Sequence, residues 1–265
     1  MNNILVPVDF SEASSNALSY ALQLFGKEAM SITLVHIFGA RSTALMMKNI
    51  DGVLRKDAES QLDKLLKTYK ADYPDVHFET KIRKNYPVDT IVQLSKTGDY
   101  NFIVMGTKGA SGLKEVFMGS IAGGVVAGAS TPTIVVPDNY GFKPLNDIVF
   151  AVSDQEIHNF DAIIPLRDLA LKQQSKLVLL HVTQGEIPQL GALNKLLGDV
   201  DVKVDFAYTS GDVNTDINAY LKKHNSGLVC LLRGKKTFID RLLNKSVTMK
   251  QTFNSPVPLM ILHDE

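Results

Sequence analysis

The hydrophobic and polar positions in the first half of the chain form two alternating kinds of segment. Short, mainly apolar runs are typical of strands buried in a parallel sheet. The sequence predicts four of them: Ile4–Val8, Ile32–Ile37, Phe102–Met105 and Thr133–Val136. A fifth strand, His77–Arg83, is predicted from its alternation of apolar and polar residues. Longer segments with apolar residues at helical spacing lie between them and predict helices at Ser11–Phe25, Val53–Tyr69 and Val88–Lys96. Alternating strands and helices indicate a doubly wound α/β domain.

The second half of the chain repeats the first in the same order. Three of the matched pairs are Asn3–Glu12 with Asp147–Glu156, Ile32–Phe38 with Leu177–Thr183, and Ser130–Asp138 with Ser255–Asp264. A fourth aligns Ile91 with Ile217 and Val104 with Cys230. Four matches in one order indicate two copies of one domain-sized unit. We therefore expect tandem domains at residues 1–139 and 145–265, each a five-stranded parallel sheet flanked by helices, joined by the proline- and glycine-containing linker Pro137–Asp147.

Composition narrows the class of protein without naming a function. Lys and Arg total 28 and so do Asp and Glu, so the formal net charge is zero. This balance argues against nucleic-acid binding driven by a basic excess. The single cysteine, Cys230, cannot form an intramolecular disulfide, and its apolar surroundings favour a place in the core. Because the sequence has neither a signal-peptide pattern nor an apolar run of about 20 residues, we expect a cytoplasmic protein without a membrane partner.

A glycine-rich segment follows the predicted strand Phe102–Met105. In parallel sheets, ligands bind at the carboxyl ends of the strands where the strand order reverses, so Asp9 and Gly106–Gly112 are expected to line one crevice. Neither common phosphate-binding glycine motif is present. Ser120 is nevertheless a natural N-cap for a helix whose free N–H groups would favour an anion, and Lys108 and Lys114 add positive charge. These residues alone leave a nucleotide site and a flexible connection equally open.

The spacing Gly106-x2-Gly109-x9-Gly119-Ser120 resembles the ATP-binding signature of the universal stress protein family. The opening ILVPVDFSE and the segment STPTIVVP resemble that family too, and the resemblance extends over both halves. It implies a five-stranded α/β fold related to nucleotide α-hydrolases, with ATP as ligand, with or without Mg²⁺. Asp9 is expected near the ribose, Ile37 near the adenine, and the glycine segment around the phosphates. The binding residues carried over are Pro7, Val8, Asp9, Ile37, Met105, Gly106, Lys108, Gly109, Gly119, Ser120, Ile121 and Ala122.

The second copy departs from this signature. Leu232, Lys235 and Lys245 stand where the first copy has Gly106, Gly109 and Gly119. Bulky side chains there oppose close phosphate approach. We expect the second domain not to bind ATP, although Arg233 with its lysine neighbours could hold an anion differently. Because the scaffold persists without these glycines, the sequence suggests that a ligand, rather than the fold, requires them in the first copy.

These features favour a binding protein over an enzyme. The sequence offers no arranged nucleophile, general base or pair of metal-binding carboxylates, and His36 and His181 fit packed positions better than metal ligation. We expect an ATP-binding stress-response or signalling protein, in which slow ATP hydrolysis or autophosphorylation is conceivable. Two alternatives stay open: an interaction protein with a vestigial pocket, and a nucleotide-processing enzyme. The two domains are expected to pair within one chain, and a further homodimer is left open.

Overall fold

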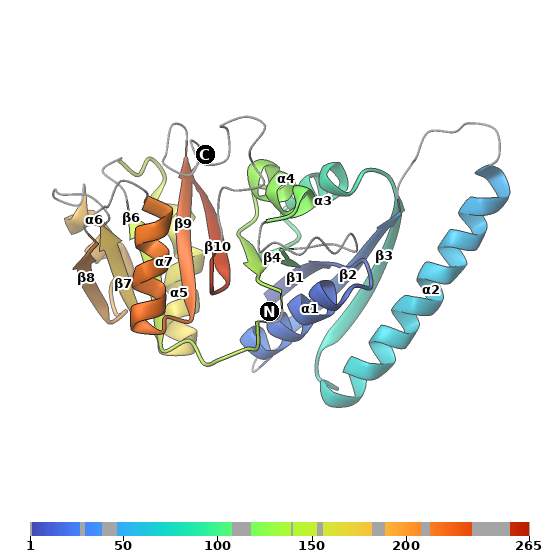
Figure 1. Ribbon diagram of the computed structural model, residues 1–265, viewed down its shortest axis with the longest axis horizontal. Coiled ribbons are helices and arrows are strands. Elements are labelled where there is room, and N and C mark those ends of the chain that lie inside the picture. The colour runs from blue at the N-terminus through green and yellow to red at the C-terminus, as the bar shows by residue number, and fades with distance from the viewer. Residues whose placement is uncertain are drawn as a thin grey trace.

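The computed structural model describes residues 2–26, 30–38, 47–107, 118–138, 140–152, 156–181, 189–207, 213–234 and 255–264 (Figure 1). The elements of the first half are β1 (Asn2–Pro7), α1 (Glu12–Phe25), β2 (Met30–Phe38), α2 (Met47–Asp72), β3 (His77–Lys84), α3 (Pro87–Ser95), β4 (Phe102–Gly106), α4 (Ser120–Gly128) and β5 (Thr133–Val136). Those of the second half are β6 (Asp147–Val152), the 3₁₀ helix η1 (Phe160–Ile163), α5 (Ile164–Gln173), β7 (Lys176–His181), α6 (Leu190–Leu197), β8 (Val202–Phe206), α7 (Val213–His224), β9 (Leu228–Gly234) and β10 (Leu259–Asp264). The five strands predicted in the first half are confirmed.

The strands of both halves form one continuous sheet with the order β3-β2-β1-β4-β5-β10-β9-β6-β7-β8. Within each half every pair of neighbouring strands is parallel, and the order is the same in both halves. The halves meet where β5 pairs with β10 in antiparallel orientation. The predicted α/β fold is confirmed, and so is the predicted pairing of the two halves within the chain.

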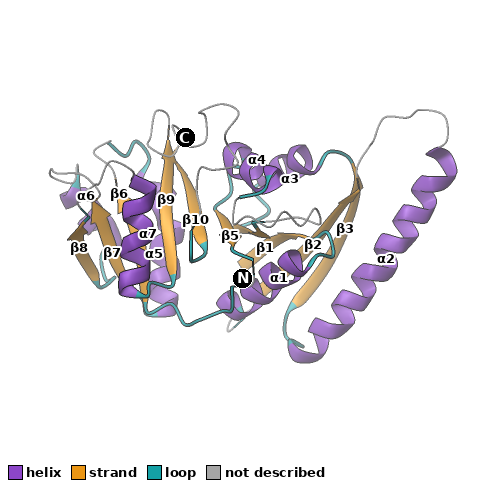
Figure 2. Ribbon diagram, in the orientation of Figure 1, coloured by secondary structure: helices purple, strands orange, loops and turns teal. Residues whose placement is uncertain are grey.

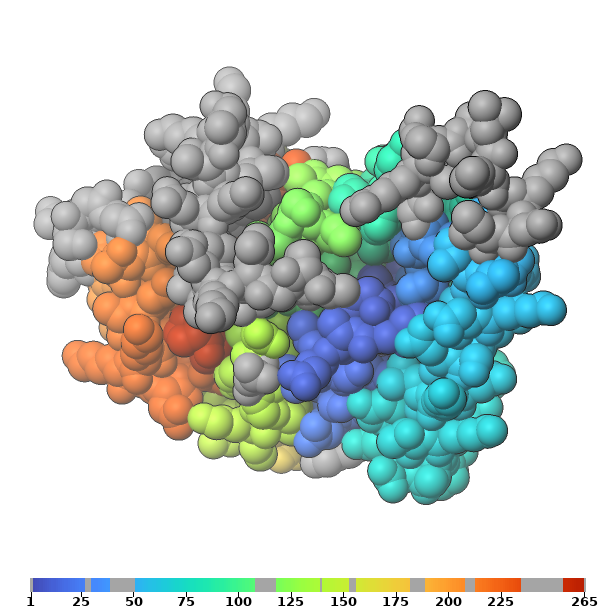
Figure 3. All heavy atoms as spheres, turned by 45° about the vertical axis from the view of Figure 1, so that its right-hand side comes forward, coloured from blue at the N-terminus to red at the C-terminus, as the bar shows by residue number. Residues whose placement is uncertain are grey.

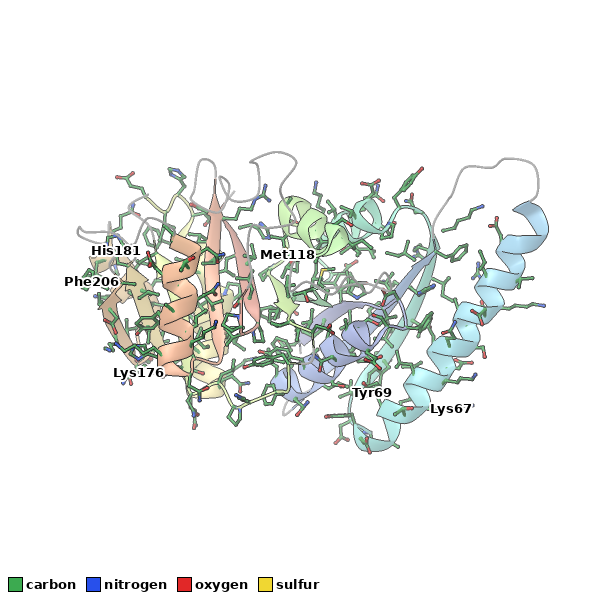
Figure 4. All side chains as sticks on the ribbon, viewed as in Figure 1. Lys67, Tyr69, Met118, Lys176, His181 and Phe206 are labelled. Atoms are coloured by element: carbon green, nitrogen blue, oxygen red, sulfur yellow. The ribbon has the colours of Figure 1, made fainter. Side chains whose placement is uncertain are left out.

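Helices cover both faces of the sheet, as Figure 2 shows. Successive residues of a strand point to opposite faces. Ile4 and Val6 of β1 accordingly pack in one core with residues of α1, α2, α5 and α6, whereas Leu5 packs in a second core with residues of α3, α4 and α7. In Figure 4, Tyr69 points from α2 toward α1 and Lys67 points away. The hydroxyl of Tyr69 lies 2.7 Å from Ser19 Oγ, which ties the two helices together.

Side-chain contacts join the halves at several points besides the sheet. Gln173 in α5 donates a 2.8 Å hydrogen bond to the carbonyl of Leu24 at the end of α1. The linker is held by Asn16, whose Nδ2 donates to the carbonyls of Pro137 and Tyr140. In Figure 3 the blue surface of α1 lies between the cyan surface of α2 and the yellow-green surface of the linker. The linker therefore packs on α1 as part of the structure.

The strand register aligns the two halves residue by residue. Leu5 pairs with Ile103 in the first half, and the equivalent Val149 pairs with Val229 in the second. Counting along β4 and β9 from these pairs places Leu232 at the position of Gly106, as the sequence repeat predicts. The same count matches Arg233 with Thr107.

Candidate functional site

A pocket of about 320 Å³ opens at the carboxyl ends of β1, β2 and β4. The strand order reverses between β1 and β4, which is the expected place for a ligand in an open parallel sheet. Helices α1, α3 and α4 also contribute lining residues. The lining residues are Pro7, Val8, Asp9, Ser14, Val35, Ile37, Pro87, Ile91, Met105, Gly106, Thr107, Gly119, Ser120, Ile121 and Ala122.

The structure brings ten of the twelve residues proposed from the sequence into this pocket. The other two, Lys108 and Gly109, lie outside the described residues. The sequence placed Thr107 in the crevice only as part of the segment Gly106–Gly112, and it did not single out four other lining residues, Ser14, Val35, Pro87 and Ile91. Thr107 continues the strand that ends at Gly106, and α3 begins at Pro87, so strand-end position was the available signal for these two. Val35 and Ile91 are ordinary core residues in the sequence.

Asp9 lies in the turn between β1 and α1, where its carboxylate has a structural role as well as a place in the pocket. Its Oδ1 accepts hydrogen bonds from the backbone N–H of Ser11, at 3.1 Å, and from Ser11 Oγ, at 2.6 Å. Ser11 is in turn the N-cap of α1, because its Oγ accepts from the N–H of Ser14. Of the described lining residues, Asp9 alone has an ionisable side chain.

The residue after Asp9 adopts a strained backbone conformation. Phe10 has a φ of 63°, in the left-handed region that bulky side chains rarely adopt. Its ring packs on His36, with ring centroids 4.5 Å apart. His36 Nδ1 lies 2.9 Å from the carbonyl oxygen of Val8, a lining residue. His36 is therefore a packed histidine, as predicted, and with Phe10 it fixes the turn that presents Asp9.

The start of α4 supplies backbone N–H groups to the pocket. The sequence predicted Ser120 as the N-cap, and this is wrong by one residue: Gly119 is the cap, and Ser120 is the first helical residue. The reason is the extended conformation of Gly119, whose N–H donates a 2.6 Å hydrogen bond to the carbonyl of Thr107. The next N–H groups, on Ser120, Ile121 and Ala122, precede the first possible intrahelical bond, so they can meet an anion in the pocket.

Glycines in α4 hold this helix against α3. A Cβ atom on Gly124 would lie 2.9 Å from both methyl carbons of Val88, and one on Gly128 would lie 3.0 Å from a methyl carbon of Val92. A Cβ atom on Gly124 would be closer than real Cβ contacts come, and one on Gly128 would be tighter than nearly all of them, so the two helices approach closely because these positions lack side chains. The packing fixes α3, and with it the lining residues Pro87 and Ile91.

The argument that only a ligand requires the glycines of the first half is wrong for Gly106. A Cβ atom there would lie 2.9 Å from the backbone oxygen of Ala13 in α1. The second half carries Leu232 at this position, and its first α-helix begins later along the chain. The repeat matches Ile164, the first residue of α5, with Tyr20, well inside α1. Gly106 is thus required by the packing of α1 on β4, whatever the pocket binds.

The start of the first helix in the second half is held by a carboxylate from β10. The N–H groups of His158 and Asn159 both donate to the buried side chain of Asp264. His181, at the end of β7, is buried and packs edge-on to Phe206, at the end of β8. Figure 4 labels both residues on this side of the molecule. Within the described part of the chain, no three His, Cys, Asp or Glu side chains group as a metal site would need. The described helices likewise include none with the length and hydrophobicity to cross a bilayer.

Comparison with known families identifies the family of the first half of the chain. Residues 1–137 match the sequence pattern described as the universal stress protein family. The chain belongs to this family. It is 28% identical over 138 residues to universal stress protein MJ0531 of Methanocaldococcus jannaschii, an alignment that covers 50% of this chain and 80% of that protein.

Two solved universal stress protein structures illustrate the range of likeness. The crystal structure of one from Archaeoglobus fulgidus matches with a TM-score of 0.79 and 21% identity, covering 100% of this chain and 99% of that one. The likeness therefore extends over both halves of the fold. A second, solved in complex with cAMP, has a TM-score of 0.35 and 18% identity over 52% of this chain and 98% of its own.

Proposed function

We propose that this universal stress protein binds ATP in the pocket of its first half and acts in stress response or signalling without being a committed catalyst. The observation that carries the proposal is the pairing, in one pocket at the reversal of strand order, of an apolar wall with the N-terminus of α4. A nucleotide needs both, since its base is largely apolar on its faces and its phosphates are anionic.

The apolar side of the pocket suits an adenine. Val35 and Ile91 are buried, Met105 is 5% exposed, and Ile37 packs beside them. These side chains come from β2, α3 and β4 and can enclose a planar ring by hydrophobic contact. Asp9 lies in the turn after β1 and lines the same pocket. In the proposed complex its carboxylate accepts a hydrogen bond from a ribose hydroxyl.

The other end of the pocket suits phosphates. The N–H groups of Ser120, Ile121 and Ala122 lie at the positive end of the α4 dipole, which favours an anion. By sequence, Gly109 gives close approach and Lys108 a positive charge. Among the described lining residues, Asp9 is the one carboxylate, and its Oδ1 already accepts two bonds from Ser11. These residues do not form a dedicated magnesium site, so no role is assigned to a metal.

In this proposal the second half, residues 145–265, binds no ATP. Leu232 occupies the position of Gly106, and by sequence Lys235 and Lys245 replace the other two signature glycines. The second half instead completes the sheet and supports the first. The competing function is that of an interaction protein whose pocket is vestigial.

The nucleotide content of the purified protein and its affinity for ATP distinguish an ATP-binding protein from an interaction protein. The protein is purified without added nucleotide and denatured, and the released material is analysed for adenine nucleotides; ATP and GTP are then titrated onto nucleotide-free protein. We expect adenine nucleotide in the preparation and preference for ATP. Gly109→Lys should abolish binding, whereas Gly141→Lys, the same change at an open linker position, should not. Failure of the wild type to bind ATP would leave the interaction protein as the better account.

A further inference from the structure

The last turn of α4 has a carbonyl that the helix itself does not satisfy. The N–H of Ala129 donates to Val125, which is the last bond of the helical pattern. The next donor, the N–H of Ser130, turns away and bonds to Ser95 Oγ at 3.2 Å. The carbonyl of Val126 is therefore one of the C-terminal carbonyls that need a partner from outside the helix.

That partner comes from the other half of the molecule. Nη1 of Arg233, near the end of β9, donates to the carbonyl of Val126 across 3.4 Å. A cation at this end of a helix also interacts favourably with the negative end of the helix dipole. Arg233 is the register equivalent of Thr107, which lines the pocket in the first half. The residue that would face a ligand in the second half thus contacts the ligand-binding helix of the first.

The opposite end of α4 carries the N–H groups at Ser120–Ala122 that line the pocket. The helix has 9 residues, so a constraint on its last turn also limits motion of its first. Helix α3 is packed against the glycines of α4, with Val88 against Gly124, and would follow it. A contact at Val126 can therefore influence two walls of the pocket.

We propose that Arg233 is a positioning residue, through which the second half holds α4 and sets the affinity of the pocket for a phosphate-bearing ligand. The part concerning affinity rests on the proposed function. The mechanical part does not, because it concerns the order of α4 in the ligand-free protein. The two parts can be measured separately.

The test compares Arg233→Met with Arg233→Lys, which restores a cation, and with Arg167→Met, which removes an arginine from α5. Hydrogen exchange is followed at the amides of Gly123–Ala129 in ligand-free protein, and ATP affinity is measured by titration. Arg233→Met should speed exchange in α4 and weaken ATP binding, each by roughly twofold to fivefold, the range for a cation at a helix C-terminus. Arg233→Lys should recover most of both losses, and Arg167→Met should change neither.

Unchanged exchange in α4 of Arg233→Met would overturn the proposal. Exchange that rises equally in α7 and in β7 would also overturn it, because the effect would then be general destabilisation. If the wild type binds no ATP while Arg233→Met loosens α4 selectively, the proposed function fails and the positioning contact stands. If α4 loosens but ATP affinity is unchanged, the effect of Arg233 on the pocket is disproved.

Discussion

At the scale of single residues, Gly106 shows that a glycine in a binding signature can be required by the fold. Its hydrogen atom faces the backbone oxygen of Ala13, and this contact fixes where α1 begins relative to β4. The turn before α1 contains Asp9 and Ser11, so its position depends on where α1 begins. One residue therefore links packing to pocket shape.

We predict that Gly106→Ala destabilises the protein by about 1–3 kcal/mol, as overpacking in a close contact does. The reason is that backbone, rather than a flexible side chain, has to move. Urea denaturation gives the change in free energy of unfolding. Gly52→Ala is the control and should be neutral or stabilising, because an added Cβ there would meet no described atom within 4 Å outside its own stretch of helix. An unperturbed Gly106→Ala would contradict this account of the β4 end.

His263 makes stability depend on pH. Burial, with a smaller contribution from Arg233, lowers the pKa of His263 from 6.5 to about 4. Neither ring nitrogen has a hydrogen-bond partner among the described residues. Between pH 4 and 6.5 the unfolded chain binds more protons at this residue than the folded protein does. The stability linked to His263 is thus full above pH 6.5 and is lost as the pH falls toward 4.

We predict that His263→Leu reduces the loss of stability between pH 7 and pH 4.5, measured by urea denaturation at both values. The wild type and His77→Leu, a change at an exposed histidine of β3, should keep the full loss. Equal pH dependence in all three proteins would contradict the assignment to His263.

The sequence was informative about pocket residues that carry a chemical signal. Asp9 and the glycine segment were recognisable because they follow predicted strands and because the glycine spacing resembles a family signature. Val35 and Ile91 carry no such signal, because their place in the pocket follows from strand register and helix packing. The strain at Phe10 is equally invisible, since nothing in its identity indicates a positive φ.

At the scale of elements, the close packing of α3 on α4 shapes the pocket. The sequence indicated a helix in the stretch that contains Gly124 and Gly128, but it did not reveal which face its glycines occupy. That information lies in the contact with Val88 and Val92. The prediction of Ser120 as the N-cap was wrong for a similar reason. The hydrogen bond from Gly119 to Thr107 joins residues far apart in the sequence, so local sequence preferences do not reveal it.

We predict that Gly124→Ala separates the two helices, lowers stability by about 1–3 kcal/mol and weakens ATP binding. Because valine is stiff about its first side-chain torsion, Val88 cannot easily move aside. Adding Val88→Ala should recover part of both losses, which a double-mutant cycle measures as coupling. Gly123→Ala, whose Cβ would be 3.9 Å from Met118 Sδ, is the matched control and should have no harmful effect. Additive effects of the two changes would contradict direct contact.

At the scale of the whole molecule, the two halves form one structure through the antiparallel pair of β5 and β10. The repeat and its order were readable from the sequence, because hydrophobic periodicity is local. The pairing of Thr133–Val136 with β10 was not, because a buried apolar run looks the same at the edge of a sheet and at its centre. The halves share a topology but differ at the ends of their strands, where Leu232 stands in place of Gly106.

This asymmetry makes the number of bound nucleotides the most direct test of the central claim. Nucleotide-free protein is mixed with excess ATP and examined by native mass spectrometry, together with Gly109→Lys and Leu232→Gly. The account predicts one ATP per chain for the wild type, none for Gly109→Lys and still one for Leu232→Gly. Two ATP molecules per chain in the wild type, or one that persists in Gly109→Lys, would contradict it.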